Sequence, residues 1–146
     1  MTNIWVRQAR EEDAANFTNW FVTMPSFTSD VLKYPSYTLC AFSNKVLAYG
    51  VVNFAEDIQV LSRVVVNPEA SVLEQAGASK EIVQAVITIG YLNQRKEIYF
   101  VGDHKGTNRI AEHIFKQVPY EDYKHVFDSS EFPVYRLRLE ELENGR

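Results

Sequence analysis

The chain has 146 residues, 46% of them hydrophobic, 13% aromatic and 23% charged, which suits one domain with its own core over residues 1–146. A net charge of −4 provides no general attraction for nucleic acid or for an anionic membrane surface, so neither is an expected partner. Mean hydropathy is −0.23 and no apolar run reaches the roughly 18 residues of a membrane helix, which favours a protein of the cytoplasm.

The first part of the chain predicts a strand followed by a helix. Residues 5–9 alternate as a short strand. After the three acids at 11–13, apolar residues recur at helical spacing until Pro25, namely Ala14, Phe17, Phe21 and Met24. The stretch 26–35 is ambiguous, and residues 30–34 can be interpreted as a short second helix.

Three strands joined by tight turns are predicted next. Residues 37–42, 46–54 and 58–66 are rich in valine, tyrosine and small apolar residues. Ser43-Asn44-Lys45 forms a polar turn between the first two, and Glu56-Asp57 forms one between the second and third. Consecutive hairpins of this kind predict an antiparallel meander.

After the third of these strands the apolar period becomes helical. Ser79 is predicted to cap a helix that runs to Arg95. Its broad apolar face consists of Ile82, Val83, Val86, Ile87, Ile89 and Tyr91. Residues 97–102, EIYFVG, have the composition of a buried strand, and because a helix precedes them we expect a crossover to a parallel position.

The remaining residues predict one more helix and a closing pair of strands. The helix begins at Thr107 or Asn108 and ends at Pro119, with one apolar side made of Ile110, Ala111, Ile114, Phe115 and Val118. Residues 120–127 and 132–139 are the predicted strands, and residues 140–146 are expected to be a flexible charged tail.

The order of elements is therefore β-α-α-β-β-β-α-β-α-β-β. It predicts an α+β domain whose mixed, mostly antiparallel sheet carries helices on both faces. Because a crossover helix separates strands 58–66 and 97–102, we expect these strands to diverge and to leave a cleft between them.

The loop before the predicted helix is a candidate anion site. Unsatisfied N–H groups at a helix start bind phosphate, and small residues allow its close approach to the backbone. The small residues here are Ala76, Gly77, Ala78 and Ser79. An ordinary strand-to-helix loop is the alternative, and the spacing alone does not decide between them.

The chain resembles the GCN5-related N-acetyltransferases at this point. The strand VLSRVVVNPEA, the small-residue loop and the long helix look like the acyl-coenzyme A-binding core of that family, and the element order matches along almost the whole chain. The phrase TNRIAEHIFKQVPY is similar to the family's Asn-led fourth helix. The resemblance implies acetyl-CoA as cofactor, held by Val64, Val65, Val66, Gln75, Ala76, Gly77, Ala78, Ser79 and Asn108.

Several positions depart from the family's pattern. With Gly77 as the loop's fourth residue, Glu74 stands first, where the family usually has Arg or Gln beside the phosphates. Gln75 supplies an amide only if the loop is shifted by one residue. Phe115 stands where the family commonly has a tyrosine that protonates the leaving thiolate, and Pro119-Tyr120 replaces a glycine–aromatic pair.

Acetyl transfer to an amine has its own chemical requirements. A base must take the proton of the amine, and Glu56 and Asp57 are the candidates, with simple turn chemistry as the alternative. Backbone N–H groups of residues 63–66 are candidate donors to the thioester oxygen. Tyr120 or Tyr123 is the candidate acid for the leaving thiolate.

The other reactive or charged residues point to no separate chemistry. Cys40 cannot form an intrachain disulfide, and its apolar neighbours favour a buried strand thiol over a nucleophile. No spacing suggests a metal site, and no nucleophile-elbow motif supports a hydrolase. The basic cluster Arg95, Lys96, His104, Lys105 and Arg109 is interpreted as a solvated surface or as an anion site.

Two functional hypotheses follow. The first is an N-acyltransferase that moves an acetyl group from acetyl-CoA to an amine of a small molecule or a protein. The alternative is a catalytically inactive binding or structural protein of the same fold, since the chain is also similar in size and shape to acetyltransferase-like phage proteins, including virion components. A homo-oligomer or a larger protein assembly stays open under both.

Overall fold

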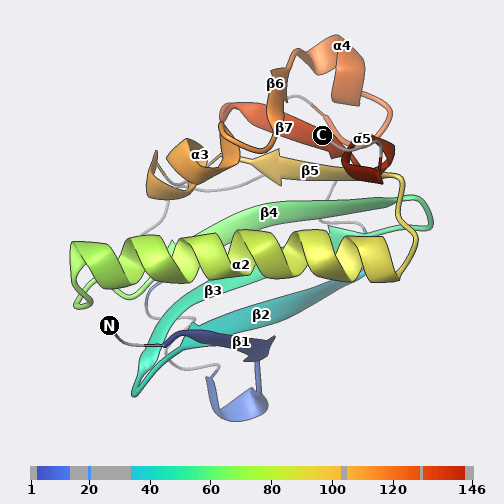
Figure 1. Cartoon of the computed structure of the whole chain (residues 1–146). Helices are drawn as coiled ribbons and strands as arrows, with labels where there is room; N and C mark the ends of the chain where they lie inside the picture. Colours follow the sequence, from blue (N-terminus) through green and yellow to red (C-terminus); the bar gives the residue numbers. More distant parts are fainter. Residues whose placement is uncertain (1–2, 14–19, 21–33, 103–104, 129, 144–146) are drawn as a thin grey trace.

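The computed structural model describes residues 3–13, 20, 34–102, 105–128 and 130–143. Within these residues the strands join one seven-stranded sheet of order β1-β2-β3-β4-β5-β7-β6 (Figure 1). The strands are β1 (Trp5–Gln8), β2 (Ser36–Phe42), β3 (Val46–Phe54), β4 (Ile58–Val66), β5 (Glu97–Val101), β6 (Lys116–Val118) and β7 (Val134–Arg138). The predicted α+β architecture with a mixed, mostly antiparallel sheet is confirmed.

The predicted meander is present at its predicted positions. β1 pairs with β2, β2 with β3, and β3 with β4, all antiparallel. β4 carries a bulge, because Leu61 pairs with Val52 and Arg63 with Val51, so that Ser62 is the extra residue. Cys40 is fully buried in β2, and burial raises the pKa of its thiol to about 11. The interpretation of Cys40 as a buried strand thiol is confirmed.

The helix α2 (Val72–Leu92) begins eight residues before the predicted start, which is a correction. Ser71, not Ser79, is the cap, because Ser71 and Glu74 form a reciprocal capping box. α2 lies across one face of the sheet, as Figure 1 shows. The predicted small-residue loop at Ala76–Ser79 is therefore part of the helix, and only residues 67–71 connect it to β4.

The crossover to a parallel strand is confirmed, but the elements after it differ from the prediction. The helix α3 (Lys105–Ala111) ends early, because residues 116–118 form β6 and pair with β7. A short helix, α4 (Tyr120–Tyr123), stands where the strand 120–127 was predicted. β7 confirms the strand at 132–139, and α5 (Leu139–Glu143) is helical where a tail was predicted.

Two hydrophobic clusters fill the two sides of the sheet. On the α2 side, Ile82 and Val86 pack on Leu61, Ile98 and Phe100. On the other side, strand residues that alternate with these pack against Tyr123 of α4 and against Val126 and Phe127 in the segment after it. These strand residues are Val60, Tyr99, Val101, Val118 and Val134. Helices thus cover both faces, as predicted.

Two predicted helices fall mainly outside the described residues. Of the helix expected to end at Pro25, the structure describes a 3₁₀ turn at Glu11–Asp13 and the helical residue Trp20. Of the short helix at 30–34, it describes Tyr34 alone, whose hydroxyl donates to the carbonyl of Val126 over 3.1 Å.

Candidate functional site

The candidate site begins where β4 and β5 part. The two strands pair in parallel only from Ile58↔Glu97 to Leu61↔Phe100. β4 then continues to Val66, whereas β5 ends at Val101, so the last five residues of β4 extend beyond the ladder (Figure 1). The bulge at Ser62 lies at the point where the ladder ends. Because β5 itself ends one residue after its last pair, the end of the ladder does not test the predicted divergence, which stays a prediction.

Buried polar side chains gather at the same point, and they were not among the predicted site residues. Ser62 is 1% exposed, and its hydroxyl donates to Oδ1 of Asn53 over 2.7 Å. Asn53 is 2% exposed and donates from Nδ2 to the carbonyl of Tyr34 over 3.0 Å. Arg63 is also buried. A serine and an arginine within the apolar strand IQVLSRVVV are the signal that could have identified this cluster.

The first turn of α2 is closed by the chain's own groups. The N–H of Glu74 donates to Oγ of Ser71 over 3.1 Å, and the N–H of Ser71 donates to Oε1 of Glu74 over 2.9 Å. The side-chain Nε2 of Gln75 donates to the carbonyls of Asn67 (2.9 Å) and Ala70 (3.3 Å). Within this turn the backbone N–H groups of Ser71, Glu74 and Gln75 therefore have acceptors inside the chain.

The predicted phosphate-binding residues lie deeper in the helix. Ala76, Gly77, Ala78 and Ser79 follow the first turn, where backbone N–H groups bond to carbonyls four residues earlier. Ala78 and Ser79 are also buried against the sheet. Their predicted position in an open loop with unsatisfied N–H groups is wrong, because the helix begins at Val72.

Glu74 places a negative charge at the start of α2. The hydrogen bond from the N–H of Ser71 lowers the pKa of the Glu74 carboxyl, with a smaller contribution from Lys45. The Nζ atom of Lys45 lies 4.0 Å from Oε1 of Glu74. A carboxylate at this position satisfies the positive end of the helix dipole.

Asn108 lies near the end of β5, although within α3 and not at its start. Its Nδ2 donates to the carbonyl of Gly102 over 3.1 Å, so it holds the strand end against the helix. Val64 and Val65 are buried and Val66 is half-buried at the far end of β4. Phe115 is 7% exposed and packs on Phe100, with the ring centroids 6.4 Å apart.

The predicted proton-transfer residues lie in unlike surroundings. Glu56 and Asp57 are exposed at the turn before β4, eight residues and about 26 Å along the strand from Val65. Tyr123 is buried on the face away from α2, where its hydroxyl accepts from the N–H of Ser130 over 3.2 Å. Tyr120 is 41% exposed, with its ring edge-on to Tyr123.

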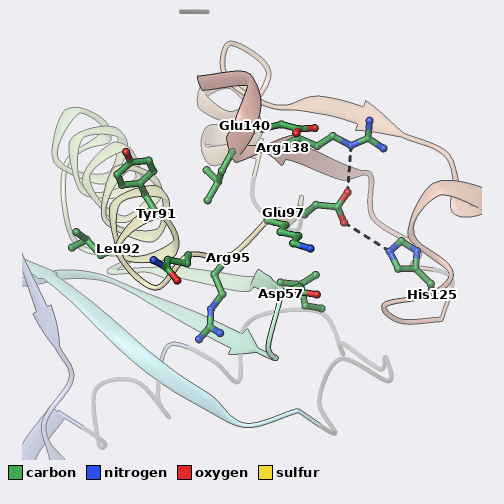
Figure 2. A pocket seen from close by; sticks show the side chains of 12 residues that line it. Asp57, Tyr91, Leu92, Arg95, Glu97, His125, Arg138 and Glu140 are labelled. Carbon is green, nitrogen blue, oxygen red and sulfur yellow. Dashed lines mark hydrogen bonds and ion pairs between the residues drawn. The ribbon is translucent and has the colours of Figure 1, made fainter. Parts of the chain in front are cut away.

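A cavity of about 770 Å³ lies at the start of β4, at the end of the strand opposite residues 64–66, and Asp57 is part of its wall. Figure 2 shows Glu97 between His125 and Arg138, with Tyr91 and Leu92 of α2 on the other side. The Glu97 carboxylate lies 3.8 Å from Nε2 of His125 and 3.4 Å from Nε of Arg138. Tyr99 also donates to it over 2.9 Å.

The basic cluster of the sequence is divided by the fold. Arg95 and Lys96 precede β5 and line the cavity, whereas Arg109 lies in α3 beyond the other end of that strand. The guanidinium of Arg95 donates to the carbonyl of Ala55 over 2.7 Å and lies over the ring of Phe54. These cations therefore do not form one anion site.

The described residues hold neither a cluster suited to a metal ion nor a helix suited to a membrane. Among them no three His, Cys, Asp or Glu side chains gather closely enough to hold a metal ion. No helix within the same part of the chain is both long and apolar enough to cross a bilayer.

The chain matches no known family by sequence, whereas its fold is similar to that of solved structures. No protein-family model matches the sequence, and no curated protein matches it significantly. An acetyltransferase of the GNAT family from Staphylococcus aureus Mu50 superimposes with a TM-score of 0.72 at 12% identity, over 94% of this chain and 99% of that one.

Two further solved structures agree with it. The spermidine/spermine N-acetyltransferase of Vibrio cholerae gives a TM-score of 0.69 at 7% identity, over 98% of both chains. A Salmonella typhimurium protein described as a putative acetyltransferase with its cofactor acetyl-CoA gives 0.60 at 11% identity, over 93% of this chain and 94% of that one. The chain therefore has the fold of the GNAT acetyltransferases.

Proposed function

We propose that the protein is an acyl-CoA-dependent N-acyltransferase that moves an acetyl group to an amine of a small molecule or a protein. The observation that carries the proposal is the extension of β4 beyond its ladder with β5, with a bulge at Ser62 where the ladder ends. Structures of this fold include one with bound acetyl-CoA and one named for its polyamine acceptors, which supports both halves of the reaction.

The two parts of the cofactor fit this chain unequally. A thioester arm fits beside residues 64–66, because that half of β4 extends beyond its ladder with β5. The diphosphate fits the start of α2 poorly, because the capping box engages the N–H groups of Ser71 and Glu74 and the Glu74 carboxylate adds a negative charge. When bound, acetyl-CoA supplies an acyl group activated as a thioester.

The chain's own residues have positioning roles in this proposal. Ser62 and Asn53 fix the bulge through their 2.7 Å hydrogen bond. Asn108 holds the residue after β5 through the carbonyl of Gly102. Glu56 and Asp57 lie beyond hydrogen-bond reach of this end of β4, so the geometry does not support them as the base.

Amide chemical-shift mapping tests where the cofactor binds. In ¹⁵N-labelled protein titrated with acetyl-CoA, we expect shifts at residues 64–66, Gly102 and Asn108. The amides of Asp57 and Glu97, at the opposite cavity, serve as the internal control and should not move. Thiol release from acetyl-CoA in the presence of a mixture of amines then tests transfer. Shifts confined to Asp57 and Glu97 would contradict the proposed site.

A second candidate function is a non-catalytic binding or structural protein of the same fold. The closed first turn of α2 favours it, because that turn leaves the donors of Ser71 and Glu74 satisfied without a ligand. Phe115 favours it too, because its buried ring carries no proton for a leaving thiolate. This function predicts no shifts at residues 64–66 at millimolar acetyl-CoA, and no thiol release.

A further inference from the structure

We propose that Glu74 determines donor selectivity at this site. Its carboxylate occupies the start of α2 and disfavours a diphosphate there, so the site recognises the acyl-pantetheine arm and gains little from the nucleotide. This inference rests on the proposed function and names the class of donor, a pantetheine thioester, that the site would accept.

The first support is the geometry of the capping box. Oε1 of Glu74 accepts the N–H of Ser71 over 2.9 Å, and the N–H of Glu74 donates to Oγ of Ser71 over 3.1 Å. An anion at a helix start binds through the N–H donors of the first turn, and that of Glu74 already has an acceptor in Ser71. The chain has thus supplied its own anion where a phosphate group would otherwise bind.

The second support is the way the connection from β4 is held. Asn67 donates from Nδ2 to the carbonyl of Val46 over 3.1 Å and accepts the N–H of Glu69 at Oδ1 over 2.9 Å. Gln75 adds a bond to the carbonyl of Asn67 over 2.9 Å. These bonds tie the connection to β3 and to the first turn of the helix, and so hold the capping box in place.

The third support is the local charge. Lys45, 4.0 Å from Glu74 and half-exposed, is the cation that faces this carboxylate. Glu69 adds a second exposed acid to the same connection. A diphosphate at the start of α2 would meet these two acids, and like charges a few ångströms apart at a protein surface weaken binding by about tenfold.

The experiment separates the charge of Glu74 from its hydrogen bond. Glu74→Gln removes the charge, yet glutamine at this position still completes a capping box, so the helix start is kept. Glu69→Gln is the matched control, because it removes one exposed acid from the same connection without touching the box. Calorimetry measures the dissociation constants of acetyl-CoA and S-acetylpantetheine for the parent and both variants, at low and at physiological salt.

We expect the parent to bind the two donors with affinities within about threefold of each other. Glu74→Gln should bind acetyl-CoA about tenfold more tightly than the parent at low salt, with a smaller gain at higher salt. The affinity of Glu74→Gln for S-acetylpantetheine should not change. Glu69→Gln should also bind acetyl-CoA more tightly than the parent, but the logarithm of its gain in affinity should be less than half of that for Glu74→Gln.

The failures are distinguishable. Equal acetyl-CoA affinity in Glu74→Gln and the parent, with both donors bound, overturns the inference and leaves the proposed function standing. A parent that binds acetyl-CoA far more tightly than S-acetylpantetheine overturns it in the same way. No binding of either donor by any of the three proteins overturns the inference and the proposed function together.

Discussion

Gly77→Ala tests whether this glycine is a helix residue or part of a phosphate-binding loop. Within a helix, glycine is about 1 kcal/mol less favourable than alanine. A Cβ atom at Gly77 would come 2.8 Å from Cδ1 of Ile4, the movable end of a half-buried side chain. Turning that methyl away costs about 0.5 kcal/mol. We therefore expect a gain of about 0.5 kcal/mol in unfolding free energy and a melting temperature raised by about 1–2 °C.

Gly50→Ala is the matched control. A Cβ atom there would come 2.7 Å from Cγ2 of Ile82 and 3.2 Å from Cδ1 of Leu61, both fully buried between α2 and the sheet. Overpacking of this kind costs about 1–3 kcal/mol. Urea unfolding followed by circular dichroism measures both variants. A loss of more than about 1 kcal/mol in Gly77→Ala would refute this reasoning, since it would require either a non-helical backbone at Gly77 or an Ile4 side chain that cannot move.

Three other predictions concern stability and reactivity. Gln94 has φ 60 just after the C-cap of α2, so Gln94→Gly should raise the unfolding free energy by about 0.5–1 kcal/mol in urea titrations; a loss would contradict the strain assigned to this residue. Hydrogen bonds from the Arg7 guanidinium and from the N–H of Arg10 lower the pKa of Asp13. The stability that follows from this shift is present above about pH 4 and is lost as the pH falls through the lower folded value, so Asp13→Asn should flatten the acid limb of a stability–pH curve. Because burial raises the pKa of Cys40 to about 11, a thiol reagent at pH 8 should label the native protein only at its unfolding rate, and rapid labelling would show that the thiol is accessible.

The parts of the fold that were predicted correctly rest on local signals. Alternating valine and tyrosine with a polar turn at Ser43–Lys45 is enough to specify the meander, because each hairpin closes within a few residues. The start of α2 was missed although its capping-box signature, Ser71 followed by Glu74, was present in the sequence. Val72 and Leu73 are 80% and 85% exposed, so the first turn shows no apolar face toward the core.

The errors near the C-terminus come from long-range pairing. Residues 110–118 have a helical apolar spacing, yet Val118 of β6 pairs with Val134 of β7. Tertiary contacts therefore override the local pattern. Paired acids such as Glu56 and Asp57 suit proton transfer by their chemistry. Their position in a turn, however, does not reveal whether the site lies at that end of the strand or at the other end. The buried pair Asn53 and Ser62 is brought together by strand register, which only the folded sheet determines.

Calorimetric titration of the unmodified protein with acetyl-CoA tests the central claim most directly. We predict saturable binding of one acetyl-CoA per chain, weaker than micromolar because Glu74 opposes the diphosphate, and accompanied by a rise in melting temperature. The absence of both heat and thermal shift at millimolar acetyl-CoA would contradict the acyltransferase proposal and leave the fold as that of a binding or structural protein.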